Sequence, residues 1–182
     1  MKYTKASLIQ QYEAGDKLKF LHFWGHRPHP SGQVSSSCFS QWWEATFEVN
    51  GQAFPTAEHW MMAEKARLFG DEAIYWKILK SASPGEAKKF GREVRRFDQE
   101  TWEQHRFDIV VQGNLHKFQQ HWDLQAYLLG SGNRILVEAS PVDPIWGIGM
   151  AANHESANVP PKWQGLNLLG FALMEVRDQL MG

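Results

Sequence analysis

Two ionisable residues in the segment 54–65, Glu58 and Lys65, are spaced so that they could belong to one reactive site. Pro55 and Thr56 are typical of the start of a helix, which predicts that this segment is helical. At 3.6 residues per turn the two side chains fall nearly in line, roughly 10 Å apart along the axis. The other residues on this stripe are Met61, Met62 and Phe69. Charges on an apolar face are costly to bury unless they are paired or used. The stripe therefore indicates either one wall of a site or a salt-bridged pair at the margin of the core.

A second candidate site follows the strand expected at residues 134–139. Asp143 and Trp146 would place a carboxylate and an indole where that strand ends. Gly147 and Gly149 form a Gly-x-Gly pattern, but the third glycine and the strand-to-helix unit of a dinucleotide site are missing. The two glycines instead predict a tight turn at which the backbone can approach a ligand.

Basic residues gather in the second half of the helix expected at 84–93 and just after it, and they could bind an anion. This cluster comprises Lys88, Lys89, Arg92, Arg95 and Arg96. It is either a solvated helix face or a phosphate-binding strip, because the arginine fork matches phosphate oxygens. Within this cluster, Arg92 is the candidate substrate-binding residue.

Histidine and cysteine spacing gives no sign of a metal site. His22, His26 and His29 fit no standard zinc pattern, and Cys38 has no evident base near it in the sequence. We expect solvated loop histidines, a buried cysteine, and neither a metal nor a cofactor.

The elements that would position these residues are mostly helices with a few short strands. Helices are expected at 5–14, from Pro55 onward, and at 71–81, 84–93, 99–119, 122–129 and 167–181. Strands are expected at 20–24, at 134–139 and in a hairpin over 43–49 that turns at Asn50-Gly51. Residues 150–165 form a long irregular loop of the kind that often serves as a lid. The pattern predicts an α+β, helix-rich single domain over residues 1–182 with a small antiparallel or mixed sheet.

Composition suits a globular protein without a strong charge bias. The chain has 182 residues, is 43% hydrophobic and carries a formal net charge of -1, so no global charge draws it to nucleic acid or membrane. Its N-terminus lacks a signal-like apolar stretch, and no run approaches the length of a spanning helix. We expect a cytoplasmic protein without a membrane partner. Nine tryptophans stand out, because indoles can stack on planar ligands and face cations.

Several motifs in sequence order resemble one known family, the YbiA-like N-glycosidases of the NADAR type. They are Phe-Pro-Thr-Ala-Glu-His-Trp-Met-Met-Ala-Glu-Lys at 54–65, Arg-Phe-Asp-Gln-Glu-Thr-Trp at 96–102, Gly113-Asn114 with Lys117-Phe118, Asp-Pro-Ile-Trp-Gly-Ile-Gly-Met at 143–150, Trp-Gln-Gly-Leu-Asn-Leu-Leu-Gly at 163–170 and Leu-Met-Glu-Val-Arg at 173–177. The resemblance covers about residues 20–180.

The resemblance implies cleavage of a bond between ribose and nitrogen. Two substrate classes follow from it, phosphorylated intermediates of riboflavin biosynthesis and ADP-ribose attached to guanine, including guanine in DNA. The near-neutral charge favours the first. A non-catalytic reader of ADP-ribose is a third, less favoured alternative. Matched positions imply catalytic roles for Glu58, Lys65 and Asp143. Matched positions and the motifs above imply substrate-binding roles for Gln41, Trp102, Asn114, Trp146, Gly147, Gly149 and Asn167, and Arg177 matches a further motif position. Arg92 is added to the substrate-binding candidates from the basic cluster.

The chemistry of such a bond suggests what the matched residues would do. Positive charge develops on ribose C1, so a carboxylate beside it is stabilising. Glu58, in a first helical turn, is expected to be charged and to orient or deprotonate water. Lys65 would either bind phosphate or attack C1 of an opened ribose to form a Schiff base. Two departures from the family pattern, Gln41 in place of Asn and Met62 in place of Gln, bear on the choice of substrate.

Overall fold

The structure, a computed structural model, describes all 182 residues and divides into two units. Unit 1 comprises Met1–Ser40 and Trp122–Gly182, and unit 2 is the continuous segment Gln41–His121. Seven helices and four short strands confirm the helix-rich α+β class predicted from the sequence. None of the helices combines the length and apolar character needed to cross a membrane.

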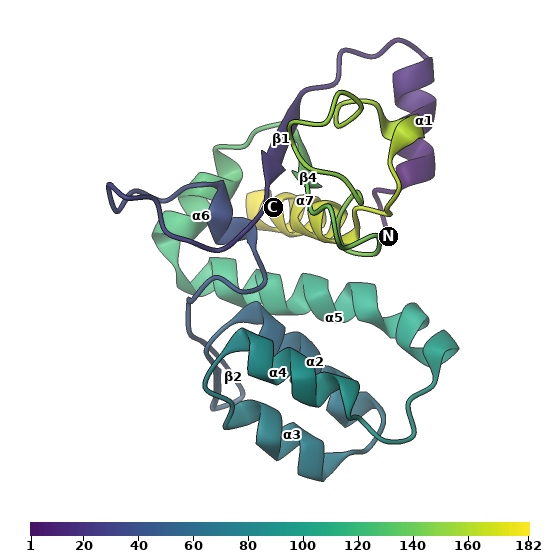
Figure 1. Cartoon of the computed structure of the whole chain (residues 1–182). Helices are drawn as coiled ribbons and strands as arrows, with labels where there is room; N and C mark the ends of the chain where they lie inside the picture. The colour runs from purple at the N-terminus through teal and green to yellow at the C-terminus, as the bar shows by residue number, and fades with distance from the viewer. The chain divides into compact units, whose positions relative to one another are not determined.

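Unit 2 is built from four helices and a hairpin (Figure 1). Its elements are β2 (Phe47–Val49), β3 (Gln52–Phe54), α2 (Ala57–Leu68), α3 (Glu72–Leu79), α4 (Pro84–Arg92) and α5 (Gln99–Gln120). Helices α2, α3 and α4 lie side by side, and α5 packs along α2. The hairpin is antiparallel, and Phe47 and Phe54 face each other as a stacked pair in its register. This arrangement surrounds α2 with neighbours, so most of its residues are buried.

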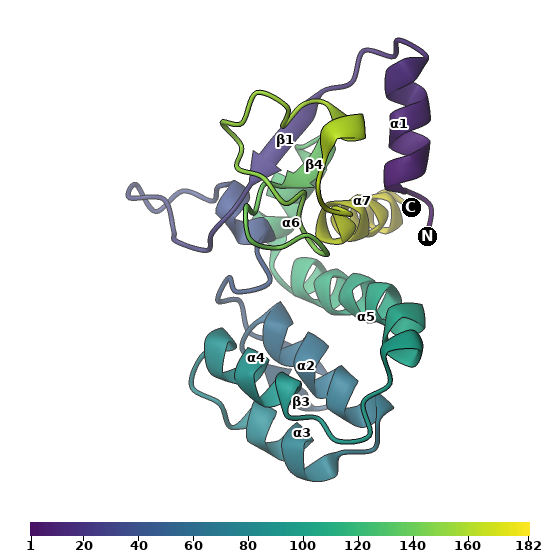
Figure 2. The same ribbon diagram turned by 45° about the vertical axis from the view of Figure 1, so that its right-hand side comes forward.

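Unit 1 combines the two ends of the chain around a parallel strand pair (Figure 2). Its elements are α1 (Lys5–Glu13), β1 (Phe20–Phe23), the short 3-10 turn η1 (Ser36–Phe39), α6 (Trp122–Leu129), β4 (Ile135–Glu138), the 3-10 turn η2 (Pro160–Lys162) and α7 (Leu168–Met181). Helix α7 packs on β4, and Leu136, Val137, Leu169 and Leu173 are buried there. The pair β1–β4 is thereby covered by the apolar side of the last helix.

The sheet differs in detail from the sequence prediction. The four strands form two separate pairs, β1–β4 and β2–β3, and β1–β4 is parallel. The strand expected from residue 43 begins only at Phe47. Residues 41–43 form a turn, and Ala45 makes a single bond across the hairpin, from its N–H to the Pro55 carbonyl over 3.2 Å. The loop at 150–165 belongs to unit 1, where the buried Trp163 indole donates a hydrogen bond to the Ala157 carbonyl over 2.9 Å. A lid role for this loop stays a prediction.

Two glycines allow close helix packing in unit 2. A Cβ at Gly113 of α5 would lie 2.2 Å from Cδ1 of Trp60, and a Cβ at Gly91 of α4 would lie 2.1 Å from Sδ of Met62. Real Cβ atoms do not come this close to other atoms. As long as the neighbouring side chain stays in place, only glycine fits at these positions. Gly113 therefore sets how closely α5 approaches α2, and with it the position of the next residue, Asn114.

Candidate active site

Glu58 is a buried carboxylate at the start of α2. Thr56 caps the helix by accepting a hydrogen bond from the His59 N–H over 3.3 Å. Glu58 is only 2% exposed, and its own N–H donates to the Gln41 carbonyl over 2.9 Å. That bond satisfies a helix N–H that has no partner within the helix. The first turn thus holds Glu58 where the helix dipole favours its charged form.

Gln41 links this turn to α5 through a buried pair of amides. Its side-chain Oε1 accepts a hydrogen bond from Nδ2 of Asn114 over 2.7 Å, and Nδ2 also donates to the Val110 carbonyl over 2.9 Å. Gln41 is 7% exposed and Asn114 is fully buried. Two atoms of the pair, Nε2 of Gln41 and Oδ1 of Asn114, have no hydrogen-bond partner in the protein. A buried donor and acceptor of this kind are costly, which suits groups that bind a ligand.

Lys65 lies one turn before the end of α2 in an aromatic surrounding. Its Nζ is 4.2 Å from the ring centroid of Phe97 and 5.6 Å from that of Trp102, and it donates to the Gly91 carbonyl over 2.8 Å. The two rings present their faces to the ammonium, a favourable contact. Burial and the neighbouring charge of Arg92 lower the pKa of Lys65. Of the two arrangements considered from the sequence, a salt-bridged pair is not the one that Lys65 adopts.

The basic cluster expected around Arg92 is not confined to one helix face. Helix α4 ends at Arg92, so Arg95 and Arg96 lie beyond the helix rather than on its face. Arg95 is bound to the carboxylate of Asp71 through Nε at 2.9 Å and Nη2 at 2.6 Å. Arg92 itself is exposed, and its charge adds to burial in lowering the pKa of Lys65. Substrate binding by Arg92 stays a prediction.

Asp143 organises a turn in unit 1. Its Oδ1 accepts hydrogen bonds from the N–H groups of Ile145 at 2.9 Å and Trp146 at 2.8 Å. This bonding fixes the backbone that carries the Trp146 indole. In the structure Asp143 is thus a positioning residue for Trp146, and a direct part for its carboxylate in the reaction stays a prediction.

Gly147, Gly149 and Asn167 hold the same turn against the strand β4. A Cβ on Gly147 would lie 2.8 Å from the Glu138 carbonyl oxygen, and Gly149 has a positive φ of 70°. Asn167 is fully buried, accepts from the Glu138 N–H through Oδ1 and donates to the Leu136 carbonyl through Nδ2, both over 2.9 Å. The atoms that closely approach these two glycines are those of other residues of this protein, such as the Glu138 carbonyl at Gly147 and the Gln164 side chain at Gly149. Ligand contact through these residues stays a prediction.

The predicted site residues therefore fall into two sets. Unit 2 holds Gln41, Glu58, Lys65, Arg92, Trp102 and Asn114, and unit 1 holds Asp143, Trp146, Gly147, Gly149 and Asn167. Sequence reasoning gave no role to Phe97, although this ring lies nearest to the Lys65 ammonium. Its place inside the motif 96–102, five residues before Trp102, was the only signal that could have identified it.

Comparisons with known proteins place the chain in a family. The model of the NADAR domain matches residues 22–181, which spans both units. N-glycosidase R617 of Acanthamoeba polyphaga mimivirus is 43% identical over 167 residues, or 88% of this chain and 96% of that protein. N-glycosidase YbiA of Escherichia coli is 33% identical over 144 residues, or 79% of each chain.

The fold of a solved relative agrees as well. The NMR structure of the Escherichia coli protein YbiA superposes with a TM-score of 0.70 at 29% identity, covering 90% of this chain and 85% of that one. The family match and the named relatives carry the same conclusion along nearly the whole sequence. The chain belongs to the NADAR family, and it is a hydrolase of the N-glycosidase class.

Proposed function

We propose that this N-glycosidase hydrolyses the ribose–nitrogen bond of a phosphorylated intermediate of riboflavin biosynthesis and releases ribose 5-phosphate. The observation that carries the proposal is the arrangement at the start of α2. There the backbone N–H of the buried residue Glu58 donates to the Gln41 carbonyl, and the Gln41 side chain bonds to Asn114. One donor of this amide pair, Nε2 of Gln41, and one acceptor, Oδ1 of Asn114, have no partner in the protein. A hydroxyl-rich sugar presents the complementary donors and acceptors.

The reaction is an addition of water across the bond that breaks. The C1–N bond gives its electron pair to the leaving nitrogen, and positive charge develops on C1. The water oxygen bonds to C1 while one of its protons passes to Glu58, which acts as the base. The nitrogen takes up the proton that Glu58 received, which regenerates the carboxylate, so the products are the sugar hydroxyl and an N–H compound. The buried position of Glu58 strengthens its attraction to the charge on C1.

The other residues of unit 2 position the substrate. We assign the free Nε2 of Gln41 and Oδ1 of Asn114 to hydrogen bonds with the substrate, and the Trp102 ring to stacking on its planar part. Lys65 keeps both roles considered from the sequence: an ammonium that binds phosphate, or an amine that forms a Schiff base with an opened ribose. Its lowered pKa supports the second and its contacts with two rings support the first.

Glu58→Gln tests the proposed base, because the variant keeps size and hydrogen-bonding capacity while removing the charge. Turnover should fall by about 10²–10⁴-fold with little change in ligand affinity. The matched control is Glu64→Gln. Glu64 lies on the same helix, and its half-buried carboxylate pairs with Arg67. Wild-type turnover by Glu58→Gln would refute the assignment.

A comparative assay tests the substrate. The wild-type protein is incubated separately with the riboflavin intermediate and with ADP-ribosylated guanosine, and release of ribose 5-phosphate or ADP-ribose is followed. Faster release of ribose 5-phosphate is expected. Preferential release of ADP-ribose would assign the enzyme to ADP-ribosylated guanine, in nucleotides or DNA. Tight binding of either compound by calorimetry with no turnover would contradict the hydrolytic role altogether.

A further inference from the structure

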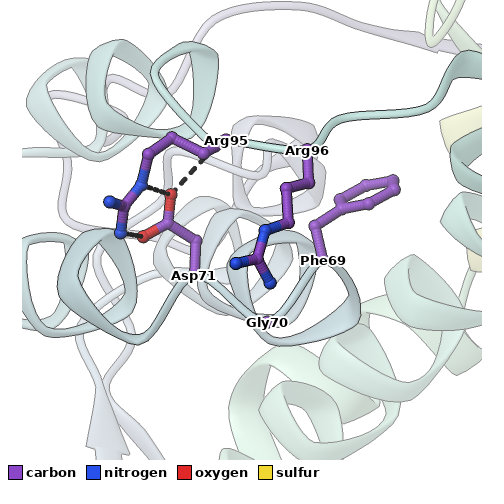
Figure 3. A pocket seen from close by; sticks show the side chains of 5 residues that line it. All are labelled: Phe69, Gly70, Asp71, Arg95 and Arg96. Carbon is purple, nitrogen blue, oxygen red and sulfur yellow. Dashed lines mark hydrogen bonds and ion pairs between the residues drawn. The ribbon is translucent and has the colours of Figure 1, made fainter.

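A pocket at the end of α2 lies outside the residues assigned above. It has a volume of about 280 Å³ and is lined by Phe69, Gly70, Asp71, Arg95 and Arg96 (Figure 3). The first three residues follow α2, and the two arginines come from the segment between α4 and α5. The pocket belongs entirely to unit 2.

The negative charge in the pocket is already neutralised. Both oxygens of Asp71 are used: they accept from the backbone N–H, Nε and Nη2 of Arg95 and from the N–H of Ile74. The Asp71 side chain is 1% exposed. These bonds hold its pKa far below the usual range, so the carboxylate is charged and paired at neutral pH. One arginine therefore cancels the acid, and the net charge of the lining is that of the second arginine.

Arg96 supplies that surplus charge. Its guanidinium extends between Asp71 and Phe69, and it makes no hydrogen bond or ion pair with the other lining residues (Figure 3). The Arg96 backbone has a φ of 57°, in the left-handed region, a conformation that costs free energy for a residue other than glycine. Gly70 leaves open space opposite, because nothing lies within 4 Å of where its Cβ would be. The fork of N–H donors is thus available in a cavity with room for an anion.

We propose that this pocket binds a phosphate group through the guanidinium of Arg96. Planar arginine donors match phosphate oxygens, and the bond is charge-assisted. The Asp71–Arg95 pair keeps the carboxylate from repelling the anion, and the Phe69 ring forms an apolar wall for the group that carries the phosphate. The inference goes beyond the proposed hydrolysis, since binding can be measured with compounds that the enzyme does not cleave.

The test titrates the full-length protein with inorganic phosphate and, separately, with ribose 5-phosphate at constant ionic strength. Binding is followed through the arginine Nε–H signals in NMR spectra. Arg96→Gly removes the guanidinium, and glycine suits the left-handed backbone, so the fold should persist. Its dissociation constant should rise about tenfold or more. The control is Arg27→Gln, which removes an exposed arginine of unit 1 and should bind as the wild type does.

The outcomes separate the alternatives. Tighter binding of ribose 5-phosphate that is weakened in Arg96→Gly identifies a sugar phosphate as the ligand of the pocket, and equal binding of both compounds, weakened in the same variant, identifies phosphate alone. Unchanged affinity in Arg96→Gly would overturn the proposal, as would an equal loss in Arg27→Gln, which would reflect net charge only. Loss of turnover in Glu58→Gln with intact phosphate binding would show that the pocket and the proposed reaction stand independently.

Discussion

Gly113→Ala should destabilise unit 2, because it introduces a Cβ where the Trp60 indole lies. That atom would be 2.2 Å from Cδ1 and 2.8 Å from Nε1 of Trp60. The indole has little room to move, since it is 8% exposed and its ring lies 5.1 Å from Phe54 and 5.8 Å from His116 between centroids. Either the ring or helix α5 must shift.

The magnitude follows from three contributions. Overpacking of a core site costs about 1–3 kcal/mol. Displacing the indole also weakens the 2.8 Å hydrogen bond from its Nε1 to the Ile109 carbonyl, which contributes about 1 kcal/mol. Alanine offsets about 1 kcal/mol through its higher helix propensity. The net loss is about 1–3 kcal/mol, and each kcal/mol lowers the midpoint of thermal unfolding by about 2–4 °C in a chain of this size.

Gly91→Ala is the matched control, because it is also a helical glycine whose Cβ would meet a side chain. The nearest atom there is Sδ of Met62 at 2.1 Å, on a flexible side chain that can rotate away. We expect a net cost of at most about 1 kcal/mol. Urea unfolding followed by circular dichroism measures both variants. Equal stability of the two, or a wild-type value for Gly113→Ala, would refute the argument from indole packing.

Three further predictions follow from groups already described. Arg92→Gln removes a positive neighbour and should therefore raise the pKa of Lys65. The pH profile of amine acylation at Lys65, measured by mass spectrometry, should shift to higher pH. An unchanged profile would contradict the electrostatic coupling of Arg92 and Lys65. Asp143→Asn keeps an Oδ1 acceptor and should retain turnover, whereas Asp143→Ala should lose it; equal loss in both would show that the charge itself takes part. Asp71→Asn should lower the unfolding midpoint most above the ordinary Asp pKa of 3.8. The difference from wild type should shrink as pH falls below 3.8, because the folded-state pKa is depressed; a constant difference would argue against the ion pair.

Local signals in the sequence were enough to place most elements. Asn50-Gly51 correctly marked the hairpin turn between β2 and β3, and Thr56 correctly marked the cap of α2. The last helix was expected at 167–181 and spans Leu168–Met181. Each of these features depends on neighbouring residues, so the pattern of apolar and capping side chains is sufficient.

Features that depend on distant residues were not predicted. The parallel pairing of Phe20 with Ile135 joins segments far apart in the chain, and strand periodicity carries no information about the partner. The bonds from Arg95 to Asp71 also join residues 24 positions apart, and the local pattern of basic residues does not indicate such a distant partner. The motif around Glu58 indicates a candidate carboxylate. The hydrogen-bonded amide pair of Gln41 and Asn114 depends on the packing of α5 beside α2, which that motif does not indicate.

The order in which the units occupy the chain has a consequence for biosynthesis. Unit 2 is one uninterrupted segment, and its two ends are bonded to each other: Gln120 exchanges hydrogen bonds with the Glu48 backbone, and His121 contacts the Thr46 carbonyl. A ribosome will have delivered every residue of that segment before β4 is made. Strand β1 is synthesised earlier, so it can pair with its partner strand only after Ile135–Glu138 has been made. Until then the nascent chain carries an open strand edge, the kind of surface that chaperones protect.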